Sequence, residues 1–175
     1  TGNLTISGAS SVEMVNTSCL NLTLNGSDLK AVDCNFGNLT TTGSSSIKLG
    51  ACAFGNLNTT DSNVTMVDSN ASTTNVTGGK ARFHRSKFGN VTFDNGCDWE
   101  AHDSWITGYL YSYNSHSKLF RSSVWSDFRH YTVSYQGEDL DCVVHQCFLR
   151  GESRFYGKRT WVAYSLIGQA YPYGS

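Results

Sequence analysis

CNFGNLTTT, at residues 34–42, returns as CAFGNLNTT at residues 52–60 and as SKFGNVTFD at residues 86–94. Related segments at a spacing of about 18 residues are typical of repeat proteins, in which each repeat buries the same positions against its neighbours. The fold is therefore decided by the columns of equivalent residues that this repeat generates.

One column holds a small residue, Ser or Cys, with an apolar residue three positions before it and another two positions after it. Alternating side chains between Gly, Asn and Ser corners indicate short β-strands, about three in each repeat, such as LKAVD, CNF and LTT. We predict an all-β fold, a parallel β-helix (β-solenoid) of about nine rungs of roughly 18 residues. The column comprises Ser18, Cys34, Cys52, Ser69, Ser86, Ser104, Ser122, Cys147 and Ser165, at intervals of 16, 18, 17, 17, 18, 18, 25 and 18 residues.

A second column holds asparagine, at Asn3, Asn21, Asn38, Asn56, Asn75 and Asn90. An asparagine at a corner accepts the left-handed backbone and can pass side-chain hydrogen bonds from rung to rung. With this ladder and its stacked interior columns, the chain resembles the right-handed parallel β-helix (pectate-lyase-like) superfamily, of the virus or phage surface-spike type. The resemblance is architectural and covers residues 1 to about 170. It favours a right-handed coil and implies a homotrimer, the usual assembly of spike-like relatives.

Composition restricts the domain organisation and the partners. Seventeen glycines, one proline and abundant Ser, Thr and Asn argue against long helices. A formal charge of -1 gives no electrostatic case for nucleic acid, and no apolar run in this segment is long enough for membrane insertion. We predict a single solenoid domain over residues 1–175, a fragment of a longer chain because the repeat reaches both ends without a cap. Residues 1–96 form polar, sequon-rich rungs, and residues 97–175 form aromatic-rich rungs.

Two outward columns alternate in charge on successive rungs: Arg82, Glu100 and Lys118, and beside them Arg85, Asp103 and Arg121. Each is either a charge ladder that stabilises the stack or one wall of a polar groove that holds a sugar or an acidic ligand. His84 and His102 lie on adjacent rungs and are expected to stack as surface rings, so no metal site and no other cofactor is predicted.

The long interval before Cys147 adds about seven residues to one rung, near residues 127–141. Loops on a rigid solenoid are common binding sites, and this one mixes aromatic and charged residues suited to sugar recognition. Beneath it, Tyr109, Tyr111 and Tyr113 share one face, which suits either ligand contact or packing. The predicted ligand-binding residues are Arg85, Asp103, Arg121, Arg129, His130, Tyr131 and Tyr135.

The cysteines and the asparagine sequons are the residues that indicate whether the protein passes through a secretory pathway. Cys34 and Cys52 occupy adjacent rungs within disulfide range, and Cys142 and Cys147 flank one strand, but free buried thiols fit these positions equally well. Ten asparagines lie in Asn-X-Ser/Thr sequons, and those outside the ladder favour a secretory glycoprotein. The predicted glycosylation sites are Asn16, Asn25, Asn58, Asn63 and Asn70.

The leading functional hypothesis is a non-enzymatic solenoid region of a virion or cell-surface attachment protein, which binds a host glycan or receptor through residues after about 97. This places the chain outside the cell or on a virion. One alternative is a tailspike-like polysaccharide depolymerase, with acid and base among Glu100, Asp103, Asp127 and Glu138. The other alternative is a structural spacer that binds nothing.

Overall fold

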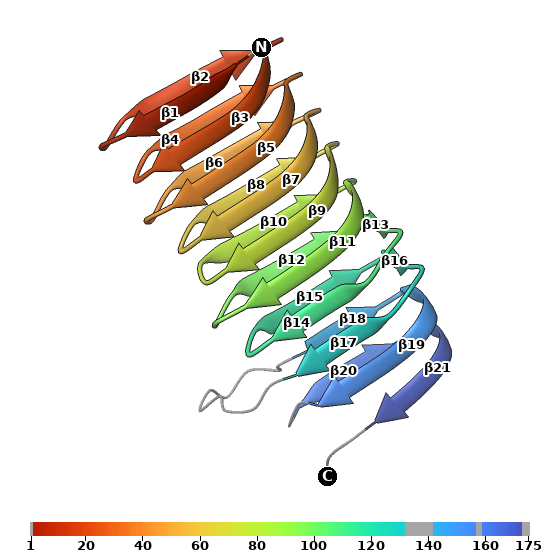
Figure 1. The fold of residues 1–175 in the computed structure, drawn as a ribbon. Helices are drawn as coiled ribbons and strands as arrows, with labels where there is room; N and C mark the ends of the chain where they lie inside the picture. The colour runs from red at the N-terminus through yellow and green to blue at the C-terminus, as the bar shows by residue number, and fades with distance from the viewer. Residues whose placement is uncertain (1, 132–141, 157–158, 173–175) are drawn as a thin grey trace.

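The computed structural model describes residues 2–131, 142–156 and 159–172, which form one stack of parallel strands with the two ends of the chain at opposite ends of the stack (Figure 1). The described residues contain strands and no helix, in two sheets of twelve and nine strands. This confirms the predicted all-β solenoid. Each rung contributes one strand to the nine-stranded sheet, so the chain makes about eight full turns from the first of these strands to the last.

The nine-stranded sheet consists of short strands paired in sequence order. They are β2 (Ser11–Val15), β4 (Asp28–Val32), β6 (Ser46–Gly50), β8 (Asn63–Val67), β10 (Lys80–His84), β12 (Asp98–His102), β15 (His116–Phe120), β18 (Cys142–His145) and β20 (Thr160–Ala163).

The twelve-stranded sheet contains the longer strands. They are β1 (Asn3–Ser7), β3 (Ser18–Asn25), β5 (Asn35–Thr42), β7 (Ala53–Thr60), β9 (Asn70–Thr77), β11 (Lys87–Asp94), β13 (Trp105–Ile106), β14 (Leu110–Tyr113), β16 (Ser123–Val124), β17 (Phe128–Tyr131), β19 (Phe148–Tyr156) and β21 (Leu166–Pro172).

Most rungs therefore have two strands and not the three expected from the sequence. The predicted strands CNF and LTT are continuous in β5, and only the rungs that contain β13 with β14 and β16 with β17 divide this side into two strands. The register is parallel and repeats every 17 or 18 residues through most of the stack, as in the pairing of Leu39 with Leu57 and of Phe83 with Ala101.

A corner with left-handed backbone connects each short strand to the next long strand. Its first residue has a positive φ, for example 53° at Asp33 and 44° at Arg121, and the small residue that follows is buried. The Ser86 hydroxyl accepts a hydrogen bond from the backbone N–H of Ser69, at 3.3 Å, and donates to the carbonyl oxygen of His84, at 2.9 Å. A small side chain fits this buried corner, and its hydroxyl or thiol group can hydrogen-bond to the backbone there. This explains the column of Ser and Cys residues.

The first rung corrects the predicted column. Ser18 pairs with Asn35, and the carbonyl oxygen of Thr17 accepts a hydrogen bond from the Asn35 N–H at 2.9 Å, so Thr17 and not Ser18 is the equivalent of Cys34. Leu20, expected in the core, is 58% exposed. The prediction was wrong here because Thr and Ser both suit the corner, and the sequence alone does not distinguish the two registers.

The asparagine ladder is real but shorter than expected. Side-chain hydrogen bonds of 2.6–2.7 Å link Asn3, Asn21, Asn38 and Asn56 in order. Thr73 takes the next position in the column, while Asn75 donates to Asn58 in a neighbouring column, at 2.8 Å. The linked residues lie within strands and not at left-handed corners, so the corner role predicted for them was wrong.

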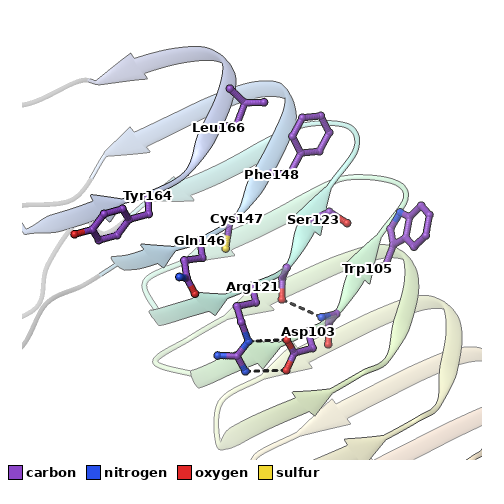
Figure 2. Close-up of a pocket in the computed structure, with 11 residues that line it drawn as sticks. Asp103, Trp105, Arg121, Ser123, Gln146, Cys147, Phe148, Tyr164 and Leu166 are labelled. Atoms are coloured by element: carbon purple, nitrogen blue, oxygen red, sulfur yellow. Dashed lines mark hydrogen bonds and ion pairs between the residues drawn. The ribbon is translucent and has the colours of Figure 1, made fainter.

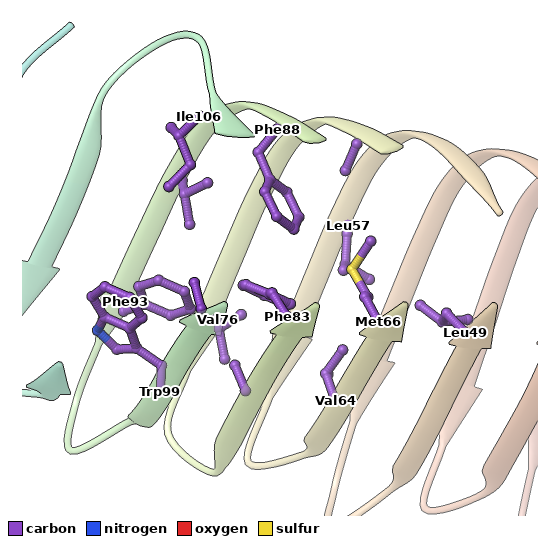
Figure 3. Close-up of a cluster of buried hydrophobic side chains, with 14 of the residues drawn as sticks. Leu49, Leu57, Val64, Met66, Val76, Phe83, Phe88, Phe93, Trp99 and Ile106 are labelled. Atoms are coloured by element: carbon purple, nitrogen blue, oxygen red, sulfur yellow. The ribbon is translucent and has the colours of Figure 1, made fainter. Parts of the chain in front are cut away.

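The core is a continuous column of inward side chains between the two sheets, with aromatic rings concentrated in the middle rungs, from β10 to β12 (Figure 3). Phe93 stacks on Trp99 with ring centroids 4.4 Å apart. The Trp99 indole N–H donates to the Ser112 hydroxyl, at 3.1 Å, so this large buried ring has its polar atom satisfied. No helix in the described part of the chain is long and apolar enough to cross a membrane.

Candidate ligand-binding groove

Two arginine–carboxylate pairs line the left-handed corner of the solenoid. Arg121 makes two hydrogen bonds to the carboxylate of Asp103, at 2.7 and 2.8 Å, and Arg85 makes two of 2.8 Å to Asp68. The bidentate hydrogen bonds from Arg121 hold the pKa of Asp103 below its usual range. The predicted column of Arg85, Asp103 and Arg121 is therefore confirmed as a run of neighbouring corner residues, but it is divided into two separate pairs.

The Asp103–Arg121 pair borders a shallow groove of about 550 Å³ over the last rungs. Figure 2 shows the ion pair on one side of the groove and the rings of Trp105 and Phe148 on the other. Ser123, Gln146, Tyr164 and Leu166 also line it. The groove thus combines hydrogen-bonding groups with exposed aromatic faces, which is the chemistry that sugar rings bind.

An aromatic stripe, defined as Trp105, Trp125 and Phe148, crosses the outer face at β13, just after β16 and at the start of β19. The ring centroids of the two tryptophans are 5.7 Å apart and nearly parallel, and Phe148 meets Trp125 edge-on at 6.1 Å. The three residues are 47%, 39% and 37% exposed. Large aromatic residues with this much exposed area side by side mark a binding surface more often than isolated exposed residues do.

The stripe residues were not among the predicted binding residues, although the sequence carries a signal for two of the three. The residue two positions after each small corner residue faces the core, so the residue one position after it must face outward. Trp105 follows Ser104 and Phe148 follows Cys147 in this way, and both are exposed. Trp125 lies three positions after Ser122 and belongs to a neighbouring column, so this alternation predicts only Trp105 and Phe148.

A second surface lies at the far end of the same rungs, where a tyrosine face comprises Tyr109, Tyr111, Tyr113, Tyr131 and Tyr156. Tyr131 stacks between Tyr113 and Tyr156, with centroids 5.3 and 4.5 Å away. The Arg129 guanidinium lies 5.1 Å from the centre of the Tyr111 ring and hydrogen-bonds to Asp127 at 3.0 Å. Arg129 and Tyr131, predicted to bind with Arg121, therefore belong to a different surface.

His130 faces the interior. It alternates with its neighbours in β17, is fully buried, and its Nδ1 lies 2.9 Å from the hydroxyl of Ser117. Ser117 in turn contacts the Ser112 hydroxyl at 2.8 Å, which links His130 to the hydrogen bond from Trp99. In this position the side chain completes a buried polar network and is not available to a surface ligand. Tyr135 and Glu138 lie outside the described residues, as does most of the inserted segment.

The described carboxylates of the depolymerase alternative lie on different parts of the rung. Glu100 belongs to β12 and pairs with Arg82 at 2.7 Å, Asp103 lies at the corner, and Asp127 precedes β17 on the other sheet. Each has an arginine partner. Among the described residues, no group of three or more His, Cys, Asp or Glu could hold a metal ion.

The histidine pair is confirmed as a surface stack. The rings of His84 and His102 are 5.1 Å apart and nearly parallel, and Phe120 continues the stack at 4.7 Å from His102. Partial burial lowers the pKa of His102 from its usual value.

All six cysteines are buried free thiols, so the structure joins neither Cys34 to Cys52 nor Cys142 to Cys147. Cys34 and Cys52 do occupy equivalent corners on adjacent rungs, as expected. Cys142 lies in β18, where it pairs with Ser117, and Cys147 lies at the following corner. Burial raises the pKa of Cys147.

The sequons divide by exposure. Asn16, Asn25, Asn63 and Asn70 are exposed, whereas Asn58 is half-buried and accepts the hydrogen bond from Asn75. Four of the five predicted glycosylation sites are therefore accessible in the folded chain.

Comparisons of the chain with protein-family models, with curated proteins and with solved structures found no match.

Proposed function

We propose that the protein is the β-solenoid region of a virion or cell-surface attachment protein, located outside the cell, and that its aromatic-rich rungs bind a host glycan without cleaving it. The single observation that carries the proposal is the exposed stripe of Trp105, Trp125 and Phe148 beside the groove at Asp103 and Arg121. Sugar rings present apolar C–H faces that pack on indoles and hydroxyl groups that bond to polar side chains. The right-handed, spike-like form of the β-helix is part of the same proposal.

The scaffold suits this function because the binding residues lie on strands and corners fixed by the stack. A surface held in place on both sides by parallel strands loses little conformational entropy when a ligand binds. The exposed sequons at Asn16, Asn25 and Asn63 lie on earlier rungs than the stripe, so glycans on them would leave the stripe uncovered. Asn70 pairs with Lys87 beside the stripe, so the proposal requires that Asn70 carries no glycan.

The experiment is a glycan-array screen followed by calorimetry on the sugars that bind. Trp105→Ala and Trp125→Ala should each weaken binding by about tenfold or more, because a buried aromatic contact contributes of the order of 1–2 kcal/mol. Trp161→Ala is the matched control, since Trp161 is 43% exposed but belongs to β20 of the other sheet. If the stripe variants bind as tightly as the unmodified protein while remaining folded, this surface is not the glycan site.

A further inference from the structure

Two cations flank the aromatic stripe, one at each end. The Lys87 ammonium lies 5.8 Å from the centre of the Trp105 ring, and the Arg150 guanidinium lies 5.0 Å from that of Trp125. Both side chains belong to exposed residues. Within the described part of the chain neither forms a salt bridge, in contrast to Arg85 and Arg121, whose charges are matched by Asp68 and Asp103. The unmatched charge along the stripe is therefore positive.

The stripe and its cations run along the solenoid axis. Lys87 pairs with Trp105, Trp105 with Ser123, and Ser123 with Phe148, so Lys87 and the strand that carries Arg150 are three rungs apart. At about 4.8 Å for each rung, the two cations are attached to strands roughly 14 Å apart. A compact monosaccharide does not span such a distance, whereas a short linear chain does.

A second groove extends the path toward the amino-terminal rungs. It has a volume of about 510 Å³ and is lined by Ala53, Asn70, Ala71, Lys87, Gly89 and Thr107, among others. Lys87 is part of its wall, while Trp105 and Phe148 line the groove at Asp103. The two grooves therefore meet at the Lys87–Trp105 contact. Ala53 and Gly89 carry little or no side chain, which leaves the outer face of these rungs shallow and open.

We propose that the ligand is a linear acidic glycan that runs along the solenoid axis, with its sugar faces on Trp105 and Trp125 and its carboxylates at Lys87 and Arg150. The inference rests on the proposed function and names the class of sugar. A surface that repeats every rung matches a polymer that repeats along its length. Carboxylates supply the anions that the two cations lack, and each cation already lies against an indole, so charge and stacking act on the same sugar chain.

The test uses oligosaccharides of hyaluronan and of α2,8-linked sialic acid in increasing length, each beside the same oligosaccharides with their carboxyl groups reduced to alcohols. The acidic form should bind about tenfold or more tightly than its reduced form, and this advantage should shrink as salt is added. Affinity should rise with chain length until the chain spans both cations, and then level off. The series that binds identifies the acidic sugar.

Lys87→Gln and Arg150→Gln should each remove most of the preference for the acidic form, so that the acidic and reduced forms bind with similar affinity. Lys48→Gln is the matched control, because Lys48 is an exposed lysine of β6 on the other sheet. Equal binding of acidic and reduced forms, or binding of neutral glycans alone, overturns the inference and leaves the proposed function standing. Absence of any glycan binding by the folded protein overturns both. In that case, a protein that binds the unmodified chain but not Trp105→Ala would be the ligand of the stripe.

Discussion

Asp103 and Arg121 combine two energetic features at one corner. Both hold a left-handed backbone, with φ of 53° and 44°, which for residues other than glycine costs roughly 1–2 kcal/mol. The cost is offset because every rung turns at the same place and hydrogen-bonds to the next, as the Arg121 N–H does to the carbonyl oxygen of His145 at 3.0 Å. The side chains are thereby presented outward in a fixed direction, where they bond to each other and border the groove.

The Asp103–Arg121 pair should make a small, pH-dependent contribution to stability. The pair lowers the pKa of Asp103 in the folded state, so its stabilisation is present above the unfolded carboxyl pKa of about 3.9 and is lost as the pH falls through the lower folded value. Asp103→Asn should therefore lower Tm slightly at pH 7 and leave it unchanged at a pH below the folded pKa. Thermal melts followed by circular dichroism at both pH values measure this difference.

Asp68→Asn serves as the comparison for that measurement, because Asp68 makes the same bidentate contact with Arg85 but does not line the groove. Both variants should show the same pH trend, and both effects should decrease in high salt since the pairs are exposed. A loss of stability on Asp103→Asn that persists at low pH would mean that the carboxylate does something other than pair with Arg121.

At the scale of the strand, the long elements bend where their outer positions carry almost no side chain. Gly37, Gly55 and Gly89 lie at this bend in β5, β7 and β11, and each backbone passes close to a carbonyl oxygen of the preceding rung. A Cβ on Gly55 would overlap the carbonyl oxygen of Gly37, which is backbone and cannot rotate away. Close packing of successive backbones is thus what allows each eight-residue strand to follow the curve of the rung.

Gly55→Ala should destabilise the protein by about 1–3 kcal/mol, because the added methyl group forces successive rungs apart at the bend. Gly50→Ala is the control, since a Cβ there would lie 4.0 Å from the Val32 side chain, an ordinary contact, and alanine suits a strand better than glycine does. Urea unfolding of the two variants compares them directly. If Gly55→Ala were as stable as Gly50→Ala, the bend would not depend on close approach of the backbones.

The sequence pattern predicted the strands and the core better than it predicted the ligand-binding residues. Alternation from Cys34 and Cys52 placed Phe36 and Phe54 in the core, where they stack at 5.3 Å. The same alternation turns the residue before each of them outward, and this is the position that Trp105 and Phe148 occupy on later rungs. His130 was assigned to a loop because the long interval removes the spacing signal, while β17 in fact continues to Tyr131.

The groove itself lies beyond what spacing can predict. The repeat spacing predicts which residues are neighbours along the solenoid axis. It does not predict how far apart two columns of residues lie around the rung. Arg121 and Arg129 are close in sequence and were predicted to act together, yet the turn after β16 carries them to separate surfaces. Only the path of the rung in space decides which outward columns share a groove.

For the whole molecule, parallel in-register stacking means that each rung contacts only its neighbours. Stability is then close to a sum of rung and interface terms, and a rung can be removed if the remaining columns still align. The pairing of Asn56 with Thr73 and of Leu57 with Thr74 defines such a unit, residues 57–73. Its removal would join Asn56 directly to Thr74 and leave Val76 pointing into the core.

Deletion of residues 57–73 should give a folded, shorter solenoid that still melts cooperatively and still binds glycan, because the stripe and its cations all come from later rungs. Deletion of residues 57–72 is the matched control: it retains Thr73, shifts the strand by one residue and turns Val76, fully buried in the intact protein, toward solvent. That variant should lose cooperative melting. If both deletions behaved alike, the inward columns would not set the register of the strands.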